Sequence, residues 1–262
     1  MRLFVLGDSF TENLFENYDN QIIDGNHGVT NYLDKLKSKN IDDYVWWTDW
    51  LKNMGYDVYN FGKSGCDIND IIYQFGQIDS KFIESDRIII NLTNFNRFTW
   101  YFKEHGPSYI NINSTLDEID GNLKTELINQ CVIRNECFNR NDGYLRNDVC
   151  KFINYLLSVH SKYKPLVWSP FDENIGVIDK KYWVDFVVLK HKLLEHKIPI
   201  NIKEETFNEI NDHHLGRYGN YYWALMLDKI IKDVIFLPHT RKMVDDIILN
   251  NSLDFKSLPK LI

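Results

Sequence analysis

The chain has 262 residues, a net charge of −7, and acidic and basic residues interspersed along its length. This length indicates one domain, because single α/β domains often reach it, and a hydrophobic content of 44% is enough for a sizeable core. No region is basic enough to follow a phosphate backbone, so we expect no nucleic-acid partner.

The sequence also argues against a membrane-spanning or secreted protein. No apolar run approaches the roughly 18 residues that cross a membrane, and the N-terminal residues lack the features of a signal peptide. The four cysteines form no C-x-x-C pair, and the spacing of Cys131 and Cys137 fits no common zinc site. We therefore expect free thiols in a reducing compartment such as the cytoplasm.

Apolar runs and helical spacing predict alternating strands and helices in the first part of the chain. The expected strand at 86–92 contains three successive isoleucines, which suit a strand buried on both faces. Asp67 is placed to cap the helix that follows it. The expected elements are a strand at 2–6, a helix at 44–54, a strand at 56–60, a helix at 68–75 and a strand at 86–92.

The second part of the chain is expected to begin with an irregular stretch at 95–123, because Gly106, Pro107 and Gly121 interrupt it. Strands and helices then alternate again. They are helices at 123–140 and 144–163, a strand at 164–170, a helix at 181–196, a strand at 198–202, a helix at 216–235 and a helical patch at 244–249.

This alternation predicts a parallel sheet wrapped by helices on both faces. We expect a single domain over 1–262, in which 100–150 is the best candidate for an insertion and 236–262 for a C-terminal extension. Ligands bind at the carboxyl ends of the strands in such sheets. The loops after the first, second, third and fifth strands are therefore the expected location of any chemistry.

The first of these loops is Gly7-Asp8-Ser9. Ser9 would follow a strand at the start of a helix, where its hydroxyl is exposed and helix-start amides lie beside it. Such a serine is a candidate nucleophile. On these residues alone, Asp8 or Ser9 could equally be the N-cap of the next helix.

The loops after the second and third strands offer candidate donors to an anionic oxygen. Gly65 lets a backbone amide face such an oxygen without a side chain in the way, and Asn94 has a side-chain amide. Taken singly, Gly65 could be a turn residue and Asn94 a helix cap. Cys66, beside Gly65, is expected to be a buried, inert thiol.

The fourth loop, Asn211-Asp-His-His-Leu-Gly216, contains an acid and a base close together. His214 is a candidate general base, and Asp212 is a carboxylate that could orient its ring. Taken alone, Asp212 could be a helix cap and His214 an exposed loop residue. Together with Ser9 they supply the parts of an acyl-transfer site.

In these blocks the chain resembles the SGNH (GDSL-type) serine hydrolases, over about residues 2 to 225. The family's first block, G-D-S, is present in full, and Asn60-x-Gly62-x-x-Gly65 matches the second. The third block keeps Asn94 but lacks its flanking Gly and Asp. The resemblance implies a flavodoxin-like, three-layer α/β/α sandwich with a central parallel sheet of about five strands.

The resemblance also implies a role for each residue. Ser9 would be the nucleophile, His214 the base and Asp212 the acid that orients the base. The oxyanion hole would consist of the amides of Ser9 and Gly65 and the side chain of Asn94. No metal or cofactor is implied.

Two residues are candidates for the acid of this set. The family's usual last block is D-x-x-H, which puts Asn211 where the acid stands, whereas Asp212 gives the D-x-H spacing of some branches. Asp212 is favoured, but Asn211 would make the site nearer to a Ser-His dyad.

For the function, we expect an esterase that removes a short acyl group, with acetyl favoured, from a carbohydrate or another small alcohol. Two alternatives stay open. One is a lipase, thioesterase or acyltransferase with the same three residues, and the other is a non-catalytic binding or structural protein on a degenerate scaffold. The oligomeric state is not indicated by the sequence.

Overall fold

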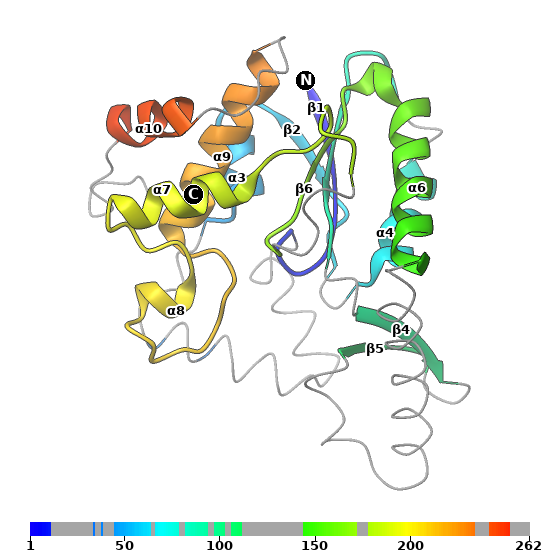
Figure 1. Cartoon of the computed structure of the whole chain (residues 1–262), viewed down its shortest axis with the longest axis horizontal. Helices are drawn as coiled ribbons and strands as arrows, with labels where there is room; N and C mark the ends of the chain where they lie inside the picture. The colour runs from blue at the N-terminus through cyan, green and yellow to red at the C-terminus, as the bar shows by residue number, and fades with distance from the viewer. Residues whose placement is uncertain are drawn as a thin grey trace, which may run out of the picture. The chain divides into compact units, whose positions relative to one another are not determined.

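The computed structural model of the chain describes residues 1–11, 34, 38, 45–63, 66–78, 82–93, 97–102, 106–111, 144–171, 178–233 and 241–251. Its main sheet has four parallel strands in the order β2-β1-β3-β6 (Figure 1). These strands are β1 (Arg2–Leu6), β2 (Asp57–Asn60), β3 (Arg87–Asn91) and β6 (Leu166–Trp168). The strands predicted at 2–6, 56–60, 86–92 and 164–170 are therefore confirmed.

The fold class is α/β, as predicted, and the sheet with its helices agrees with a three-layer α/β/α sandwich. Counted along the chain, the strands have the order 2-1-3-4, which is the flavodoxin-like order without its last strand. The order reverses at β1. Ligands bind at such a reversal, outside the carboxyl ends of the strands, and the chain leaves β1 there toward Gly7 and Ser9.

The fifth strand predicted at 198–202 was wrong. Pro199 has no N–H group for a sheet ladder, and the helix α8 (Ile202–Glu205) begins within the segment. The backbone of the segment instead bonds the loop that ends at Gly216. The amide of Gly216 donates to the carbonyl of Ile200 over 2.8 Å, and the amide of Ile202 donates to the carbonyl of His214 over 3.0 Å.

The irregular stretch predicted at 95–123 was also wrong in part. An antiparallel pair of strands, β4 (Arg97–Phe102) and β5 (Gly106–Asn111), forms within it. Aromatic and β-branched residues, which favour strands, make up most of β4. Pro107 is tolerated because both strands of a two-stranded sheet are edges.

The chain divides into two compact units. We call Arg2–Asp8 with Phe61–Val184 the central unit, and Met1, Ser9–Asn60 and Asp185–Ile262 the terminal unit. A single domain with an insertion at 100–150 and an extension at 236–262 stays a prediction, and the helix predicted at 123–140 lies outside the described residues.

The central unit is built around β1 and β3, in which Val5 lies opposite Ile89. Helix α4 (Ile68–Ile78) begins after Asp67, whose carboxylate accepts hydrogen bonds from two amides of the first turn, as predicted for a cap. Helix α6 (Tyr144–Val159) follows later in the chain and is continued by the 3-10 helix η3 (Ser161–Tyr163). Their shared core includes Phe4, Leu6, Ile71, Phe75, Ile88, Ile90, Ile153, Leu157 and Val167.

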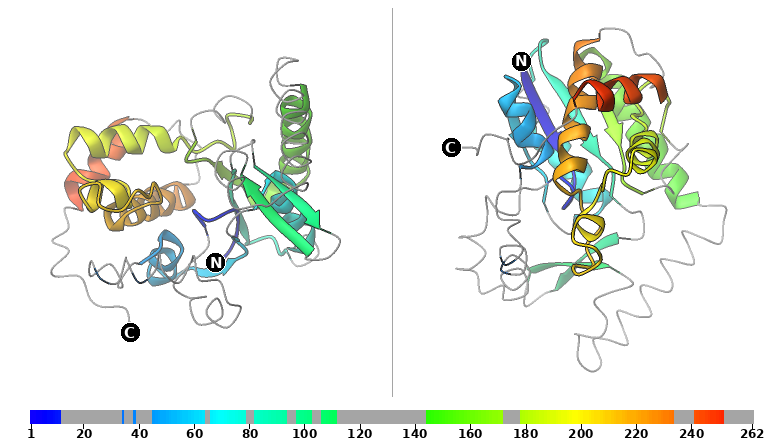
Figure 2. Two further views of the ribbon diagram at one scale, coloured as in Figure 1. Left: turned by 90° about the horizontal axis from the view of Figure 1, so that it is seen from below. Right: turned by 90° about the vertical axis from the view of Figure 1, so that its left-hand side faces the viewer.

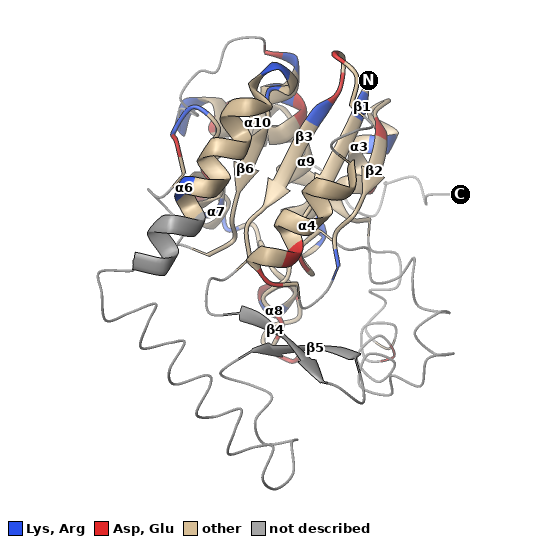
Figure 3. Ribbon diagram, turned by 90° about the vertical axis from the view of Figure 1, so that its right-hand side faces the viewer, with Lys and Arg blue, Asp and Glu red and all other residues tan. Residues whose placement is uncertain are grey.

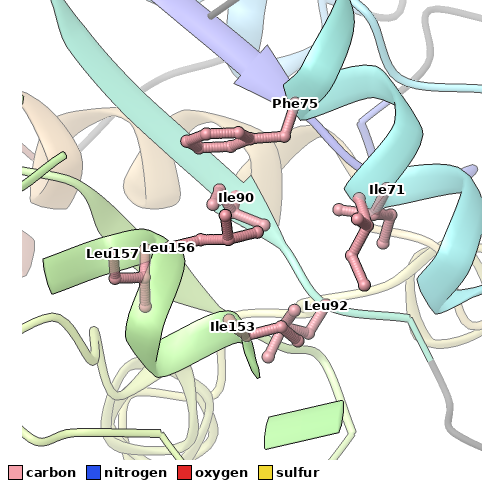
Figure 4. A pocket seen from close by; sticks show the side chains of 8 residues that line it. Ile71, Phe75, Ile90, Leu92, Ile153, Leu156 and Leu157 are labelled. Carbon is pink, nitrogen blue, oxygen red and sulfur yellow. The ribbon is translucent and has the colours of Figure 1, made fainter. Parts of the chain in front are cut away.

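A small apolar cavity lies among α4, α6 and the end of β3 (Figure 4). Its volume is about 20 Å³, which is room for roughly one water-sized group. The cavity is therefore a packing gap among apolar side chains of the central unit. Its lining consists of Ile71, Ile72, Phe75, Ile90, Leu92, Ile153, Leu156 and Leu157.

The terminal unit is built around helix α9 (Arg217–Lys232). This helix packs against α3 (Trp47–Asn53), α7 (Phe186–Glu195) and α10 (Arg241–Asn250), as Figure 2 shows. The helices predicted in these regions are confirmed with different ends. Helix α7 begins later than predicted because Asp185 caps it, with its carboxylate accepting from the Val187 amide over 3.0 Å. Of the helices in the described ranges, none combines the length and the apolar character needed to cross a membrane.

Charged residues of both signs are mixed along the described ribbon (Figure 3). Asp86, a fully buried acid, accepts from Arg2 Nε over 2.9 Å and from Arg2 Nη2 over 2.6 Å. It also accepts from the amide of Ile83. Burial by itself would raise the pKa of the Asp86 carboxyl, but the hydrogen bonds from Arg2 and Ile83 outweigh it and hold this pKa below its ordinary value.

Candidate active site

The turn that carries Ser9 begins directly after β1 and is held by two side chains of the central unit. The amide of Gly7 donates to Gln74 Oε1 over 3.0 Å, and its carbonyl accepts from Gln74 Nε2 over 3.2 Å. The fully buried Asp8 accepts from Asn91 Nδ2 over 2.8 Å. Side chains from α4 and β3 thus brace the two residues that precede Ser9, and Asp8 is part of this brace.

The structure brings Ser9, His214 and Asp212 together within the terminal unit. Ser9 Oγ lies 2.7 Å from His214 Nε2, and His214 Nδ1 lies 2.6 Å from Asp212 Oδ1. Asn211 is exposed, whereas the Asp212 side chain is only 10% accessible. The carboxylate beside the imidazole therefore belongs to Asp212, and the spacing in use is D-x-H.

The D-x-H spacing works because Asp212 forms a local turn. Its Oδ1 atom also accepts the backbone amide of His214 over 2.8 Å, which is the Asx-turn bond between an aspartate and the residue two positions on. One oxygen thus holds both the main chain and the ring of His214. A carboxylate at Nδ1 favours the tautomer with the proton on Nδ1, which leaves the Nε2 lone pair facing the Ser9 hydroxyl.

The main chain of the same loop is held by α8. The amide of Lys203 donates to the carbonyl of Asp212 over 2.8 Å, and the amide of Ile202 donates to the carbonyl of His214. The buried Thr206 accepts from the Ile210 amide through its Oγ1 over 3.2 Å. These bonds fix the backbone on both sides of the acid and the base. Sequence reasoning missed them because it assigned this region to a strand.

Two glycines let helix α9 begin close to this segment. A Cβ atom on Gly219 would lie 2.1 Å from the carbonyl oxygen of Ile200, and one on Gly216 would lie 2.5 Å from Glu205 Oε2. Real Cβ atoms do not approach backbone so closely, so any larger residue at Gly219 would push the helix away from the loop.

Phe10 is a further site residue that sequence reasoning missed. Its ring centroid lies 4.5 Å from that of the His214 ring, at an interplanar angle of 35°, and the side chain is buried. Its position directly after Ser9 was the only available signal. An aromatic ring against the imidazole excludes water from one face of the base and strengthens the hydrogen bonds that the base makes.

The predicted oxyanion donors Gly65 and Asn94 lie outside the described residues, so their part of the site stays a prediction. Cys66, next to Gly65, is buried, and this burial, followed by the charge of Asp70, raises the pKa of its thiol to about 12. Such a thiol is a poor nucleophile at neutral pH, as expected for an inert core cysteine.

No family model matches the chain, and no curated protein matches it. The resemblance to the SGNH hydrolases therefore depends on the sequence blocks themselves. In the part of the chain that the structure describes, no three His, Cys, Asp or Glu side chains gather as candidate metal ligands.

Proposed function

We propose that the chain is a serine esterase of the SGNH type, which hydrolyses short acyl esters of a carbohydrate or another small alcohol. The single observation that carries this proposal is the continuous contact from Asp212 through His214 to Ser9, with distances of 2.6 and 2.7 Å. A hydroxyl on an imidazole that is itself held by a carboxylate is the arrangement that activates serine for acyl transfer.

In the proposed reaction His214 Nε2 takes the proton of Ser9 as Ser9 Oγ attacks the ester carbonyl. The C–O bond to the alcohol then breaks, the alcohol leaves with the proton from His214, and the acyl group stays on Ser9. Water, deprotonated by His214, releases the carboxylic acid and restores the serine. Asp212 stabilises the charged imidazole in both steps, and the Ser9 and Gly65 amides with the Asn94 side chain are the proposed oxyanion donors.

A short acyl group is part of the same proposal. Ser9 itself is only 6% exposed. This burial supports a small acyl group, and acetyl is the smallest common one. The buried free thiol of Cys66 supports a reducing compartment such as the cytoplasm.

The test is acetate release from p-nitrophenyl acetate and from acetylated sugars, with Ser9→Ala as the matched control. We expect Ser9→Ala to lose about 10⁴-fold or more in kcat without a change in unfolding temperature. Equal rates for the two proteins would refute the proposal. A series of p-nitrophenyl esters of increasing chain length separates the esterase from the lipase and thioesterase alternatives, because the esterase should lose activity beyond about eight carbons.

A further inference from the structure

Two fully buried residues of the terminal unit, Trp47 at the start of α3 and Asn220 in α9, form hydrogen bonds with the residues that follow Ser9 and His214 in the chain. Neither was expected from the sequence to take part in the site. A buried polar side chain is costly unless all its groups are hydrogen-bonded. The hydrogen-bond partners of these two residues therefore indicate the role of their polar atoms.

On the serine side, Trp47 Nε1 donates to the carbonyl of Phe10 over 2.8 Å. Phe10 is the residue after Ser9, and its ring lies against the ring of His214. The indole thus fixes the main chain directly after Ser9. Through Phe10 it also fixes the aromatic ring that packs on His214.

On the histidine side, Asn220 uses both ends of its amide. Its Oδ1 accepts from the backbone amide of Trp47 over 3.0 Å. Its Nδ2 donates to the carbonyls of Leu215 over 2.9 Å and Gly216 over 3.0 Å. These are the two residues directly after His214.

We propose that Trp47 and Asn220 are positioning residues that together set the distance between Ser9 and His214. A connected path leads from the residue after the nucleophile to the residue after the base. The Trp47 indole donates to the Phe10 carbonyl, the Trp47 backbone amide donates to the Asn220 side chain, and that side chain donates to the Leu215 carbonyl. The path needs a donor at the indole and both a donor and an acceptor at position 220. Phenylalanine at position 47 or leucine at position 220 could occupy most of the same space but could not make these bonds. This inference is based on the proposed function, because it assigns these residues to the same acyl-transfer site.

The test compares Trp47→Phe with Trp223→Phe. The first variant removes the indole donor and keeps an aromatic ring. The control has the same chemical change in a fully buried tryptophan of α9 that packs on Phe186, with ring centroids 5.1 Å apart. Both variants lose similar packing, but only the first loses the bond to Phe10.

We expect Trp47→Phe to lower kcat and the rate of fluorophosphonate labelling by about 10- to 100-fold, because small misplacements of reacting groups have effects of this size. KM should stay within about twofold, and Trp223→Phe should keep both rates within about twofold. Asn220→Asp, which keeps the acceptor for the Trp47 amide but loses the donors to Leu215 and Gly216, should lower the rates over the same range. A wild-type rate in Trp47→Phe, or an equal loss in the Trp223→Phe control, would overturn the proposal.

A second readout keeps the two proposals apart. The ¹⁵N signals of the His214 ring report its contacts with Ser9 and Asp212 whether or not the protein is an enzyme. They should change in Trp47→Phe and in Asn220→Asp and stay the same in Trp223→Phe. If the wild type is not labelled at Ser9, the proposed function fails, and unchanged ring signals in the two site variants would then overturn the positioning proposal as well.

Discussion

The strands β1 and β3 and the loop from Thr206 to Gly216 are stabilised in different ways. Residues Leu3 to Leu6 and Ile88 to Ile90 are almost completely buried and are held by apolar packing along a regular parallel ladder. The loop has few buried apolar side chains. It is held by hydrogen bonds that the Asp212 carboxylate and the Thr206 hydroxyl accept, and by those that the first amides of α8 donate.

This difference teaches which property each region controls. Apolar burial is roughly proportional to area and tolerates substitution by residues of similar volume, so the strands should set stability. A hydrogen bond depends on direction as well as distance, so the loop should set the geometry of His214. We therefore expect changes in the loop to affect activity first and changes in the strands to affect stability first.

Among changes in these two regions, the largest effect should come from Asp212→Asn, which keeps the size of the side chain and an oxygen for the His214 amide but removes the charge. We expect kcat to fall by about 10³-fold, because the imidazolium loses its carboxylate and the tautomer is no longer fixed. Steady-state kinetics on p-nitrophenyl acetate measure this change. The matched control, Asn211→Ala, alters the exposed neighbour and should stay within about twofold of the wild type; a larger loss in that control would give the orienting role to Asn211.

The strand region should show the opposite behaviour. Ile89→Ala removes a fully buried side chain between Val5 and Leu166 and should lower the free energy of unfolding by about 2–5 kcal/mol. Urea denaturation measures this loss, and Ile89→Val should cost only about 0.5–1.5 kcal/mol. The activity per folded molecule should change little in either variant. If kcat in Ile89→Ala fell as far as in Asp212→Asn, the proposed difference between the two regions would be wrong.

A smaller effect than that of Ile89→Ala concerns the Arg2–Asp86 pair. Arg2→Met should lower stability at pH 7 by about 1–3 kcal/mol, because the Asp86 carboxylate stays buried without its main donor. The folded-state pKa of Asp86 is lowered, so the stability from this pair is present above the unfolded-state pKa and is lost as the pH falls through the folded-state pKa. Thermal unfolding of both proteins between neutral and acidic pH should therefore show their difference shrinking at low pH. Lys52→Met, which breaks an exposed pair with Asp49, should change stability by less than about 1 kcal/mol at any pH.

Much of the fold could be predicted because its elements have strong local signals. The isoleucines of β3, the cap Asp67 and the spacing of α9 each indicate one structure from a few neighbouring residues. The segment around Pro199 and the pair β4 and β5 could not be assigned in this way. In both, local composition was ambiguous, and pairing with a separate segment decided the outcome.

The residues of the site also differ in how far the sequence could identify them. Ser9, Asp212 and His214 could be found because their residue types and spacing follow from the chemistry of acyl transfer. Trp47 and Asn220 could not, since their roles depend on the contacts of Trp47 with Phe10 and with Asn220, which lie 37 and 173 residues away along the chain. A buried tryptophan or asparagine has no sequence pattern that distinguishes a positioning residue from a packing residue.

The central claim is that His214 activates Ser9 as a nucleophile. The most direct test is labelling of the full chain with a fluorophosphonate probe, followed by mass spectrometry of the modified peptide, in the wild type, Ser9→Ala and His214→Ala. We predict rapid modification of the wild type at Ser9, none at this position in Ser9→Ala, and a rate at least about 10³-fold lower in His214→Ala. No modification of Ser9 in the wild type, or an unchanged rate in His214→Ala, would contradict the claim.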